Sequence, residues 1–305
     1  MMFPFPFVGE FQLGMGIKPL SELNPFVVCS QAYPQEIALK RKLLAEDRSY
    51  CFKAFDSSEA AQWEAVELIG RCLTQFYPSQ FHLHIQGDTW HWENSWLHEQ
   101  QTFVFGNTAS LGLDPLDWVG RQVQEDLLLL DASAILVAGQ LCFPSGWALD
   151  EKMGNNFLEL HGPLPEDHRP MLAKASLLME RIVPGKQLQR DNWGLRVSPD
   201  LDLSTRHAMD YTDLLARTVP SLRPQNVLEK IFLRIEHQTL TRLPDSRHVL
   251  FTVHTEVSNL QLVLDSGEKK EQMACYLQTV PKAILKYKQI EPFYGQLVEG
   301  LQFRE

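Results

Sequence analysis

Residues 231–256 constrain the fold more than any other stretch of the chain. They read IFLRIEHQTLTRLPDSRHVLFTVHTE, two runs rich in β-branched and aromatic residues that flank the turn 243–246. This pattern predicts a β-hairpin, and therefore an antiparallel sheet. Alternation places Arg234, Glu236 and Gln238 on one face of the first strand. That polar row either faces solvent, the usual outcome of alternation, or lines a cavity that holds a small polar molecule.

A second informative stretch spans residues 135–165. An apolar run over 135–141 predicts a buried strand, and Phe143-Pro144-Ser145-Gly146 interrupts it. A helix is expected from Asp150 to 160, with Met153, Phe157 and Leu160 on its apolar face, because Gly162-Pro163 forces a stop.

His161 lies where that predicted helix ends. The last carbonyls of a helix favour a basic imidazole, so a capping histidine packed against the next loop is the simpler interpretation. A metal ligand is the alternative, with one ring nitrogen directed into a cavity and the other donating to a carbonyl. The residues alone leave both open.

The remaining pattern alternates between helical and extended periods. Residues 80–105 predict a short β-meander, and 188–199 predict a strand. The expected helices cover residues 35–50, 59–76, 114–127, 165–183, 269–285 and 290–303. The phenylalanines of residues 1–35 are expected to pack as an irregular arm on the main body. Together, these predicted strands and helices indicate an α+β protein.

Composition argues against several classes of function. The chain has 305 residues, 44% of them hydrophobic, enough for a large core, and a formal net charge of −10. Its one basic block, 40–42, fits a solvated helix face better than a nucleic-acid or membrane surface. No apolar run approaches 18 residues, and the short N-terminal apolar segment lacks a basic leader, so neither a membrane span nor a signal peptide is expected.

Cysteine spacing argues against a structural zinc or iron–sulfur site in this chain. Its five cysteines contain no CxxC pair, and a reduced, cytoplasmic protein is the simplest expectation. His82, His84 and His91 share a strand face and could gather a metal, but exposed strand histidines are favoured because no carboxylate or cysteine is fixed beside them. Gly-rich phosphate loops and a Gly-x-Ser-x-Gly elbow are also missing from the sequence.

Several segments, in the same order along the chain, resemble one family. The chain is similar to the alpha subunit of haem-dependent oxidative N-demethylase and its relatives. The matching pieces are MGIKPL (15–20), VQEDLLLL (123–130), CFPSGW (142–147), LHGPLP (160–165), RDNW (190–193), RIEHQTLTRLPDS (234–246) and LQTVPKAILKYKQI (277–290). No one of these motifs is sufficient alone.

The resemblance implies a single elaborated PAS-like domain over residues 1–305. Its parts would be an N-terminal arm with helices (1–78), a curved antiparallel sheet with the pocket (79–260), and C-terminal helices (261–305). Haem b would be held by one axial histidine, and His161 matches that position by order and context. Electrons would come from NADPH through a partner subunit that carries flavin (FMN) and an iron–sulfur cluster.

The implied reaction is O2-dependent N-demethylation of a small secondary amine, similar to dimethylamine, with release of formaldehyde. Arg234 could polarise iron-bound oxygen, and Glu236 could hold an ammonium substrate or take its proton. In the segment 188–199, Arg190, Asn192 and Trp193 form either a polar, aromatic-backed wall of the same pocket or a surface arginine beside a half-buried tryptophan. Arg242 is a candidate for a haem propionate, and Phe143 is a further candidate haem contact.

Two departures and two alternatives qualify this hypothesis. Relatives often carry Arg where this chain has Gly146 and His237, which affects the expected propionate contacts and substrate. Cys142 is the alternative iron ligand, although a small cysteine at a strand end is usually core packing. A haem-binding PAS-like sensor and a non-catalytic binding subunit are the competing functions; no transmitter domain or coiled coil follows the predicted pocket.

Overall fold

A long antiparallel sheet is the centre of the structure, a computed structural model that describes residues 5–12, 14, 16–160, 177–179 and 181–303. Within these residues the sheet has seven strands in the order β1-β8-β9-β10-β6-β7-β2. The strands are β1 (Lys18–Pro19), β8 (Leu188–Arg196), β9 (Phe232–Arg242), β10 (Val249–Asn259), β6 (Asp126–Leu130), β7 (Leu136–Gln140) and β2 (Phe52–Ala54). A separate meander contains β3 (Phe81–Gln86), β4 (Thr89–Asn94) and β5 (Glu99–Val104).

The predicted hairpin is confirmed as β9 and β10. The two strands pair along their full length, from Phe232 opposite Asn259 to Arg242 opposite Val249. β8 adds to the outer edge of β9, and β6 adds to the outer edge of β10. Because both neighbours also pair antiparallel, the register of this hairpin decides which side chains share a face across the four central strands.

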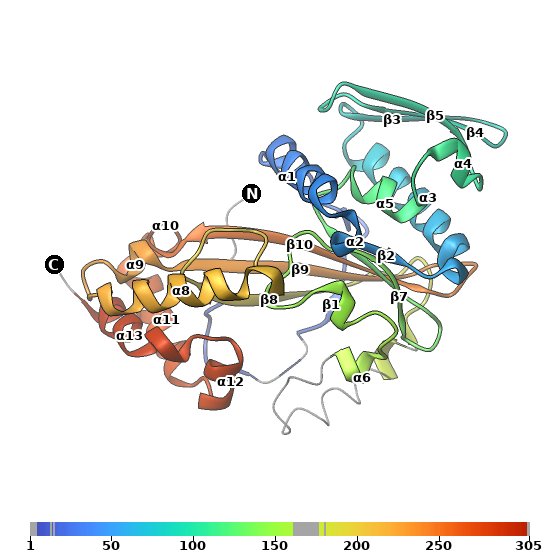
Figure 1. The fold of residues 1–305 in the computed structure, drawn as a ribbon. Coiled ribbons are helices and arrows are strands. Elements are labelled where there is room, and N and C mark those ends of the chain that lie inside the picture. Colours follow the sequence, from blue (N-terminus) through green and yellow to red (C-terminus); the bar gives the residue numbers. More distant parts are fainter. Residues whose placement is uncertain (1–4, 13, 15, 161–176, 180, 304–305) are drawn as a thin grey trace.

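Helices cover the sheet at both ends (Figure 1). The α-helices of the described residues are α1 (Tyr33–Glu46), α2 (Arg48–Cys51), α3 (Glu59–Phe76), α4 (Thr108–Leu111), α5 (Pro115–Gly120), α6 (Phe157–Leu160), α8 (Ala208–Thr218), α9 (Val227–Lys230), α10 (Leu260–Val263), α11 (Gly267–Gln278), α12 (Lys282–Tyr287) and α13 (Tyr294–Gln302). Short 3-10 turns are η1 (Asp56–Ser58), η2 (Leu149–Glu151), η4 (Thr205–His207), η5 (Val219–Ser221) and η6 (Glu291–Phe293).

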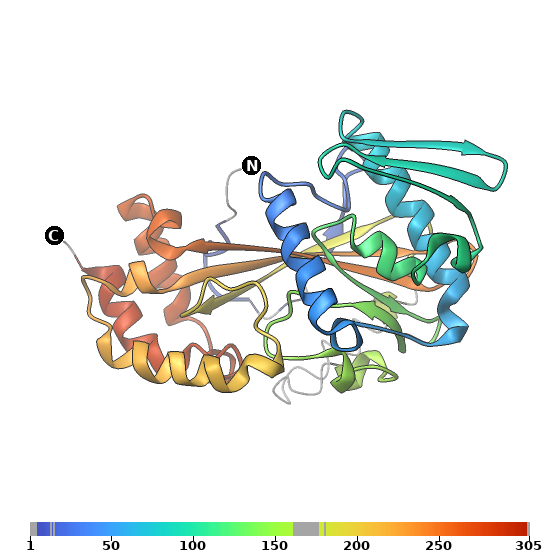
Figure 2. The ribbon, with the colours of Figure 1, turned by 45° about the horizontal axis from the view of Figure 1, so that its top comes forward.

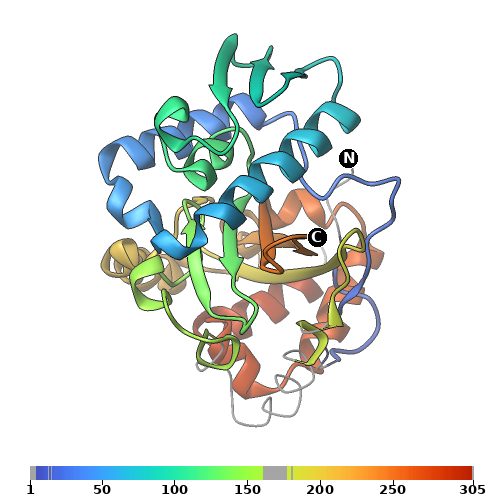
Figure 3. The same ribbon diagram turned by 90° about the vertical axis from the view of Figure 1, so that its right-hand side faces the viewer.

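Two large apolar clusters hold these layers together. One joins α1, α3, α5 and the meander to β6 and β7, with Tyr33, Ile69 and Leu129 among its fully buried members. The other joins the C-terminal helices to β8 and β9, and Phe7 of the predicted N-terminal arm is buried in it. Figure 3 shows the first layer above the large sheet and the C-terminal helices below it, and Figure 2 shows α1 crossing over the strands.

The expected helix over 114–127 is wrong in its second half. α5 ends at Gly120, and Leu127 lies on strand β6, paired with β7 and β10. All five residues of β6 are buried because both faces of this strand are covered. A run of four leucines satisfies helical spacing as well as a central strand does, and the periodicity alone therefore could not separate them.

The expected helix from Asp150 to Leu160 is also wrong. The chain forms the turn η2, then breaks at Gly154, which has a φ of +78°, and only then forms the four-residue α6. The side chain of Asn156 accepts hydrogen bonds from the amides of Leu158 and Glu159, so this Asn begins α6. Most of the expected helix over 165–183 and His161 itself lie outside the described residues.

The architecture is thus a mixed α+β fold built on antiparallel sheets, as predicted. The helix over 59–76, the meander over 80–105 and the strand within 188–199 are confirmed, whereas α8 was not predicted. Across the described ranges, none of the helices combines the length and the apolar character that crossing a bilayer requires.

Candidate functional site

The register of β8, β9 and β10 gathers the predicted polar residues on one face of the sheet. Asn192 lies opposite Glu236, Arg190 lies opposite Gln238, and Gly194 lies opposite Arg234. On the other side of β9, Thr255 lies opposite Glu236. We call this surface the Glu236 face. Of the predicted site residues, Arg190, Asn192, Arg234, Glu236 and Arg242 share it.

Glu236 is the only carboxylate among the side chains of this face that lie on β8 and β9. Its side chain is 18% exposed, and its Oε2 accepts hydrogen bonds from Asn192 Nδ2 at 3.2 Å and Gln238 Nε2 at 3.1 Å. Burial acts to raise the pKa of Glu236, but Arg234, Asn192 and Lys288 outweigh that effect and hold the pKa below its usual value. The site therefore presents a fixed, half-buried negative charge at neutral pH.

Lys288 joins this cluster from the end of α12, and sequence reasoning missed it. Its Nζ donates to the carbonyl of Trp193 at 2.6 Å and to Asn192 Oδ1 at 3.2 Å, and lies 4.4 Å from the centre of the Trp193 ring. Burial lowers the pKa of Lys288 to about 7, and the nearby Arg196 and Arg190 contribute to the same shift. No local pattern marks this lysine, because 96 residues separate it from Asn192 along the chain.

Arg234 is committed to holding the backbone of neighbouring segments. It is 2% exposed, and its guanidinium donates to the carbonyls of Leu201 at 3.0 Å and of Phe143, and to Thr255 Oγ1 at 3.4 Å. Its Nε lies 3.5 Å from Glu236 Oε1. These contacts fix the corner of chain after β7 against the site.

Arg242, the predicted propionate partner, is likewise occupied by backbone carbonyls. It donates to the carbonyls of Ile182 at 3.0 Å, Arg247 and Met179. Two of these bonds tie Met179 and Ile182 to the far end of β9. Its position stays on the Glu236 face, but its donors point at the chain itself.

Arg190 differs from both. Within the described residues no hydrogen bond or ion pair to its guanidinium is found, and its Nε is buried without a hydrogen-bond partner. Burial lowers the pKa of Arg190, and Glu236 is the group that most opposes this shift. The side chain as a whole is only partly buried, so the cost of a missing partner falls on its Nε.

The other end of the Glu236 face is apolar. Leu240, Val249 and Leu130 of three adjacent strands pack with Met179 and Ile182, and Leu128 packs with Leu141 and Leu149 nearby. Phe251 and Leu160 contact both groups. The carbonyl of Leu160 accepts a hydrogen bond from Lys152 Nζ at 2.9 Å, so the residue that precedes His161 is held against this surface.

Two predicted haem contacts lie elsewhere. Trp193 lies opposite Ile235, on the other side of β8 from Asn192, where it meets Phe7 and Tyr276 edge to face. The ring of Phe143 is buried in the large cluster around α3, and only its backbone faces the site through Arg234 and Asp126. Of two surface hollows, one lies near Gln101, and the other, near Lys230, is lined by Phe232 at the start of β9; neither is lined by Arg190, Asn192, Arg234 or Glu236.

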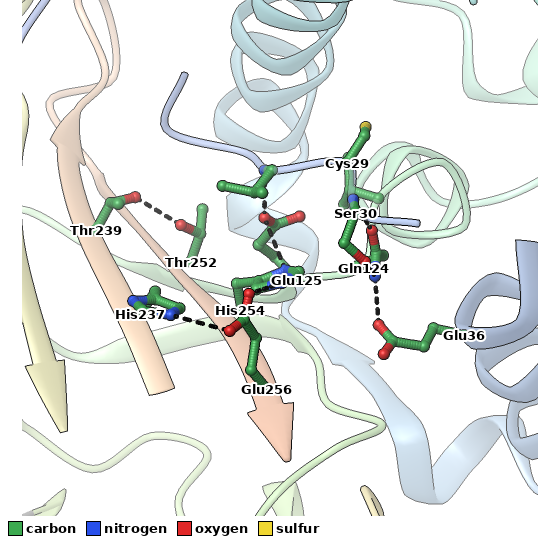
Figure 4. Close-up of polar contacts among 12 residues, drawn as sticks. Cys29, Ser30, Glu36, Gln124, Glu125, His237, Thr239, Thr252, His254 and Glu256 are labelled. Carbon is green, nitrogen blue, oxygen red and sulfur yellow. Dashed lines mark hydrogen bonds and ion pairs between the residues drawn. The ribbon is translucent and has the colours of Figure 1, made fainter. Parts of the chain in front are cut away.

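A second polar cluster lies on the opposite face of the same strands (Figure 4). His237 Nδ1 is 2.7 Å from Asp191, and its Nε2 is 3.8 Å from Glu256. His254 is 3% exposed and lies 3.4 Å from Glu125, which is 1% exposed, and 3.8 Å from Glu256. Burial acts to lower the pKa of His237, but Asp191 and Glu256 raise it to about 9.

The two positions at which the resemblance leads us to expect an arginine, Gly146 and His237, have separate settings. His237 is an imidazolium at neutral pH, so it retains the positive charge that an Arg supplies, on the face away from Glu236. Gly146 has a φ of +81°, and its amide donates to the carbonyl of Leu203 at 2.7 Å. That left-handed backbone favours glycine and disfavours an arginine at this position.

Metal binding through the strand histidines finds no support. His84 and His91 stack with ring centres 5.9 Å apart, and His91 Nδ1 contacts Thr102 Oγ1 at 2.9 Å. In the part of the chain that the structure describes, His, Cys, Asp and Glu nowhere form a group of three suited to a metal ion.

The fold and the site define a class: an α+β protein whose sheet presents one face that is charged at one end and apolar at the other. Residues 16–298 match the sequence model of the family described as haem-dependent oxidative N-demethylase, alpha subunit-like. The match covers nearly the whole chain, and the protein belongs to this family. The predicted family is therefore confirmed.

Proposed function

We propose that this chain is the haem-binding, amine-oxidising subunit of an N-demethylase, and that the Glu236 face is its active site. The observation that carries the proposal is the half-buried Glu236 carboxylate, held by Asn192 and Gln238 next to an apolar surface. A secondary ammonium with methyl groups needs both: an anion for its N–H groups and an apolar wall for its methyl groups.

The residues of this face fit a haem b. A porphyrin is apolar across its plane and carries two carboxylates at one edge, and the face offers leucines and Phe251 at one end and cations at the other. Arg190, with its buried and unpartnered Nε, is our choice for a propionate, because the donors of Arg242 are occupied. His161 stays our choice for the axial ligand; Leu160 before it packs on the apolar end.

The overall reaction we propose is (CH3)2NH + O2 + NADPH + H+ → CH3NH2 + CH2O + NADP+ + H2O, with dimethylamine as the simplest substrate. Bound haem would supply the redox-active iron that oxygen chemistry needs. The electrons would enter from an NADPH-dependent partner subunit with FMN and an iron–sulfur cluster.

The chain's own residues would bind the amine and accept one proton from it. Glu236 would accept hydrogen bonds from the ammonium and orient its methyl groups toward the apolar end. Its low pKa makes Glu236 a good counter-ion and a weak base. Lys288, with a pKa of about 7, is the better proton acceptor near neutral pH, and Asn192 bridges the two groups.

Two measurements test the proposal in order. Protein expressed with haem available is expected to show a Soret band, and His161→Ala is expected to lose it while keeping the far-UV circular dichroism of a folded chain. An unchanged band in this variant would assign the iron to another ligand, with Cys142 next to test. Amine-dependent formaldehyde release with a supplied reductase then separates an enzyme from a haem-binding sensor, which would show the band without product.

A further inference from the structure

Two buried cysteines meet beside the corner that Arg234 holds. Cys51 ends α2, and Cys142 follows β7. The amide of Leu141 donates to the carbonyl of Cys51 at 2.8 Å, which continues the pairing of β2 with β7 by one residue. The two thiol groups share a hydrogen bond. Both side chains are almost fully buried.

A guanidinium lies against one sulfur and not the other. Arg206 Nη2 is 3.4 Å from Cys51 Sγ, and the guanidinium carbon lies 4.3 Å from the centre of the Tyr50 ring. Asp202 holds the same nitrogen at 3.2 Å. A nearby cation is the standard means by which proteins favour a thiolate, the reactive form of cysteine.

The two thiols are therefore unequal. The hydrogen bond from Cys142 and the charge of Arg206 lower the pKa of Cys51, against the effect of burial. The same hydrogen bond raises the pKa of Cys142, and burial adds to that. The other buried cysteines lack a cation: burial raises the pKa of Cys29, and it raises that of Cys72 to about 11.

We propose that Cys51 and Cys142 are an oxidisable dithiol, with Cys51 as the thiol that attacks a hydroperoxide and Cys142 as the resolving thiol. The Cys51 thiolate attacks one oxygen of hydrogen peroxide, the O–O bond breaks, and Cys51 becomes a sulfenic acid while the departing hydroxide takes up a proton and leaves as water. Cys142 then attacks that sulfur, forms the S–S bond and releases a second water. In sum, two thiols and one H2O2 give one disulfide and two waters; the thiols lose two electrons, which the peroxide gains.

Access requires only a small opening. α2 has four residues, and Arg48 and Ser49 at its start are exposed. Local opening of so short an element costs far less than global unfolding, and hydrogen peroxide is little larger than water. The oxidation would act on the site through the backbone, because Asp126 accepts from the amides of Cys142 and Phe143 at 2.7 and 2.9 Å, and Arg234 holds the Phe143 carbonyl.

The test uses the full haem-loaded chain carrying Cys275→Ser, which removes the exposed thiol. Protein is treated with hydrogen peroxide, quenched with catalase, alkylated under denaturing conditions and digested without reductant. Mass spectrometry is expected to find the peptides of Cys51 and Cys142 joined and lighter by two hydrogen atoms. Full alkylation of both cysteines after treatment, in protein that stays folded, overturns the proposal.

Variants separate the two roles. Cys142→Ser is expected to stop the disulfide and to leave a Cys51 sulfenic acid that dimedone labels, whereas Cys51→Ser gives neither product. Arg206→Met is expected to slow oxidation at pH 7 several-fold, because the Cys51 thiolate loses its cationic neighbour. Cys72→Ser is the matched control, a buried cysteine without a cation, and leaves rate and product unchanged. An Arg206→Met rate equal to that of the parent contradicts the assigned role of Cys51.

Discussion

Both faces of the β9–β10 hairpin carry charged residues. On one face these residues are paired with opposite charges, and on the other face some of them are not. On the face drawn in Figure 4, His237 and His254 each lie within 4 Å of two carboxylates. On the Glu236 face, Arg190 has no such partner among the described residues, and Lys288 bonds only to neutral oxygens. Charges that are paired with a neighbour stabilise a fold, whereas cations without an anion beside them are available to bind one.

The net charge around Glu236 also differs in sign from the net charge around His254. Around Glu236 the neighbouring cations are Arg190, Arg196, Arg234 and Lys288, so positive charge exceeds negative. Around His254 the acids Glu125, Glu256 and Glu36 exceed the bases. An excess of cations on a partly apolar face suits a ligand with carboxylates at one edge, which is why we place the propionates there.

The largest effect is expected from breaking a buried pair on the paired face. Glu125→Gln removes the partner of buried His254 and should lower the free energy of unfolding by about 3–5 kcal/mol. Urea denaturation followed by circular dichroism measures this. The concentration of amine that half-saturates the folded protein should not change. A stability equal to that of the parent would mean that the Glu125–His254 pair is not a structural element.

Next in size is the corresponding change on the Glu236 face. Glu236→Gln keeps hydrogen bonds with Asn192 and Gln238 possible but removes the charge that an ammonium needs. We expect amine binding to weaken by about 2 kcal/mol, roughly 30-fold, with little loss of stability. Calorimetric titration with dimethylamine measures it. Glu256→Gln on the opposite face is the control, and an equal loss there would remove the contrast between the faces.

How far the sequence could lead differs for these two faces. Strict alternation in 232–242 was enough to place Arg234, Glu236 and Gln238 together, and the strand predicted within 188–199 added Arg190 and Asn192. The hydrogen-bond partners of these residues were not predictable. Arg234 and Arg242 donate to backbone carbonyls of loops, and the strand pattern does not encode where those loops lie. The role of Lys288 and the pairing of His237 with Asp191 could not be predicted either, because both contacts join residues that are far apart in the sequence.

The errors in secondary structure have one physical origin. Apolar residues at 123, 127 and 130 fit a helix and a doubly buried strand equally, and only the neighbouring strands decide between them. Gly154 was visible in the sequence, but its left-handed backbone divides the expected 150–160 helix into a turn and the short α6. Local periodicity thus failed where the neighbouring strands, or the backbone of a single glycine, override it.

A smaller effect is expected at Arg190. Arg190→Met removes a partly buried cation whose Nε has no hydrogen-bond partner, so the haem-free chain should be equally stable or more stable, by up to about 1 kcal/mol. The same variant should release haem to apomyoglobin about tenfold faster, because a propionate loses its charged partner. Lys18→Met, a change of an exposed cation on β1, is the control. A loss of stability without faster haem release would make Arg190 a structural residue.

A pH dependence is also expected on the paired face. The folded pKa of His237 is raised from 6.5 to about 9 by Asp191 and Glu256, although burial opposes this. A raised pKa contributes stability that is complete below the unfolded value of 6.5 and is lost as the pH rises through about 9. The difference in unfolding free energy between the parent and His237→Gln should therefore be greatest near pH 6 and shrink toward pH 9.5. Urea denaturation at several pH values measures that difference, and a constant value across the range would show that His237 carries no charge in the native protein. Because Glu236 lies on the other face, the pH dependence of amine binding in His237→Gln should match that of the parent, which separates the two clusters once more.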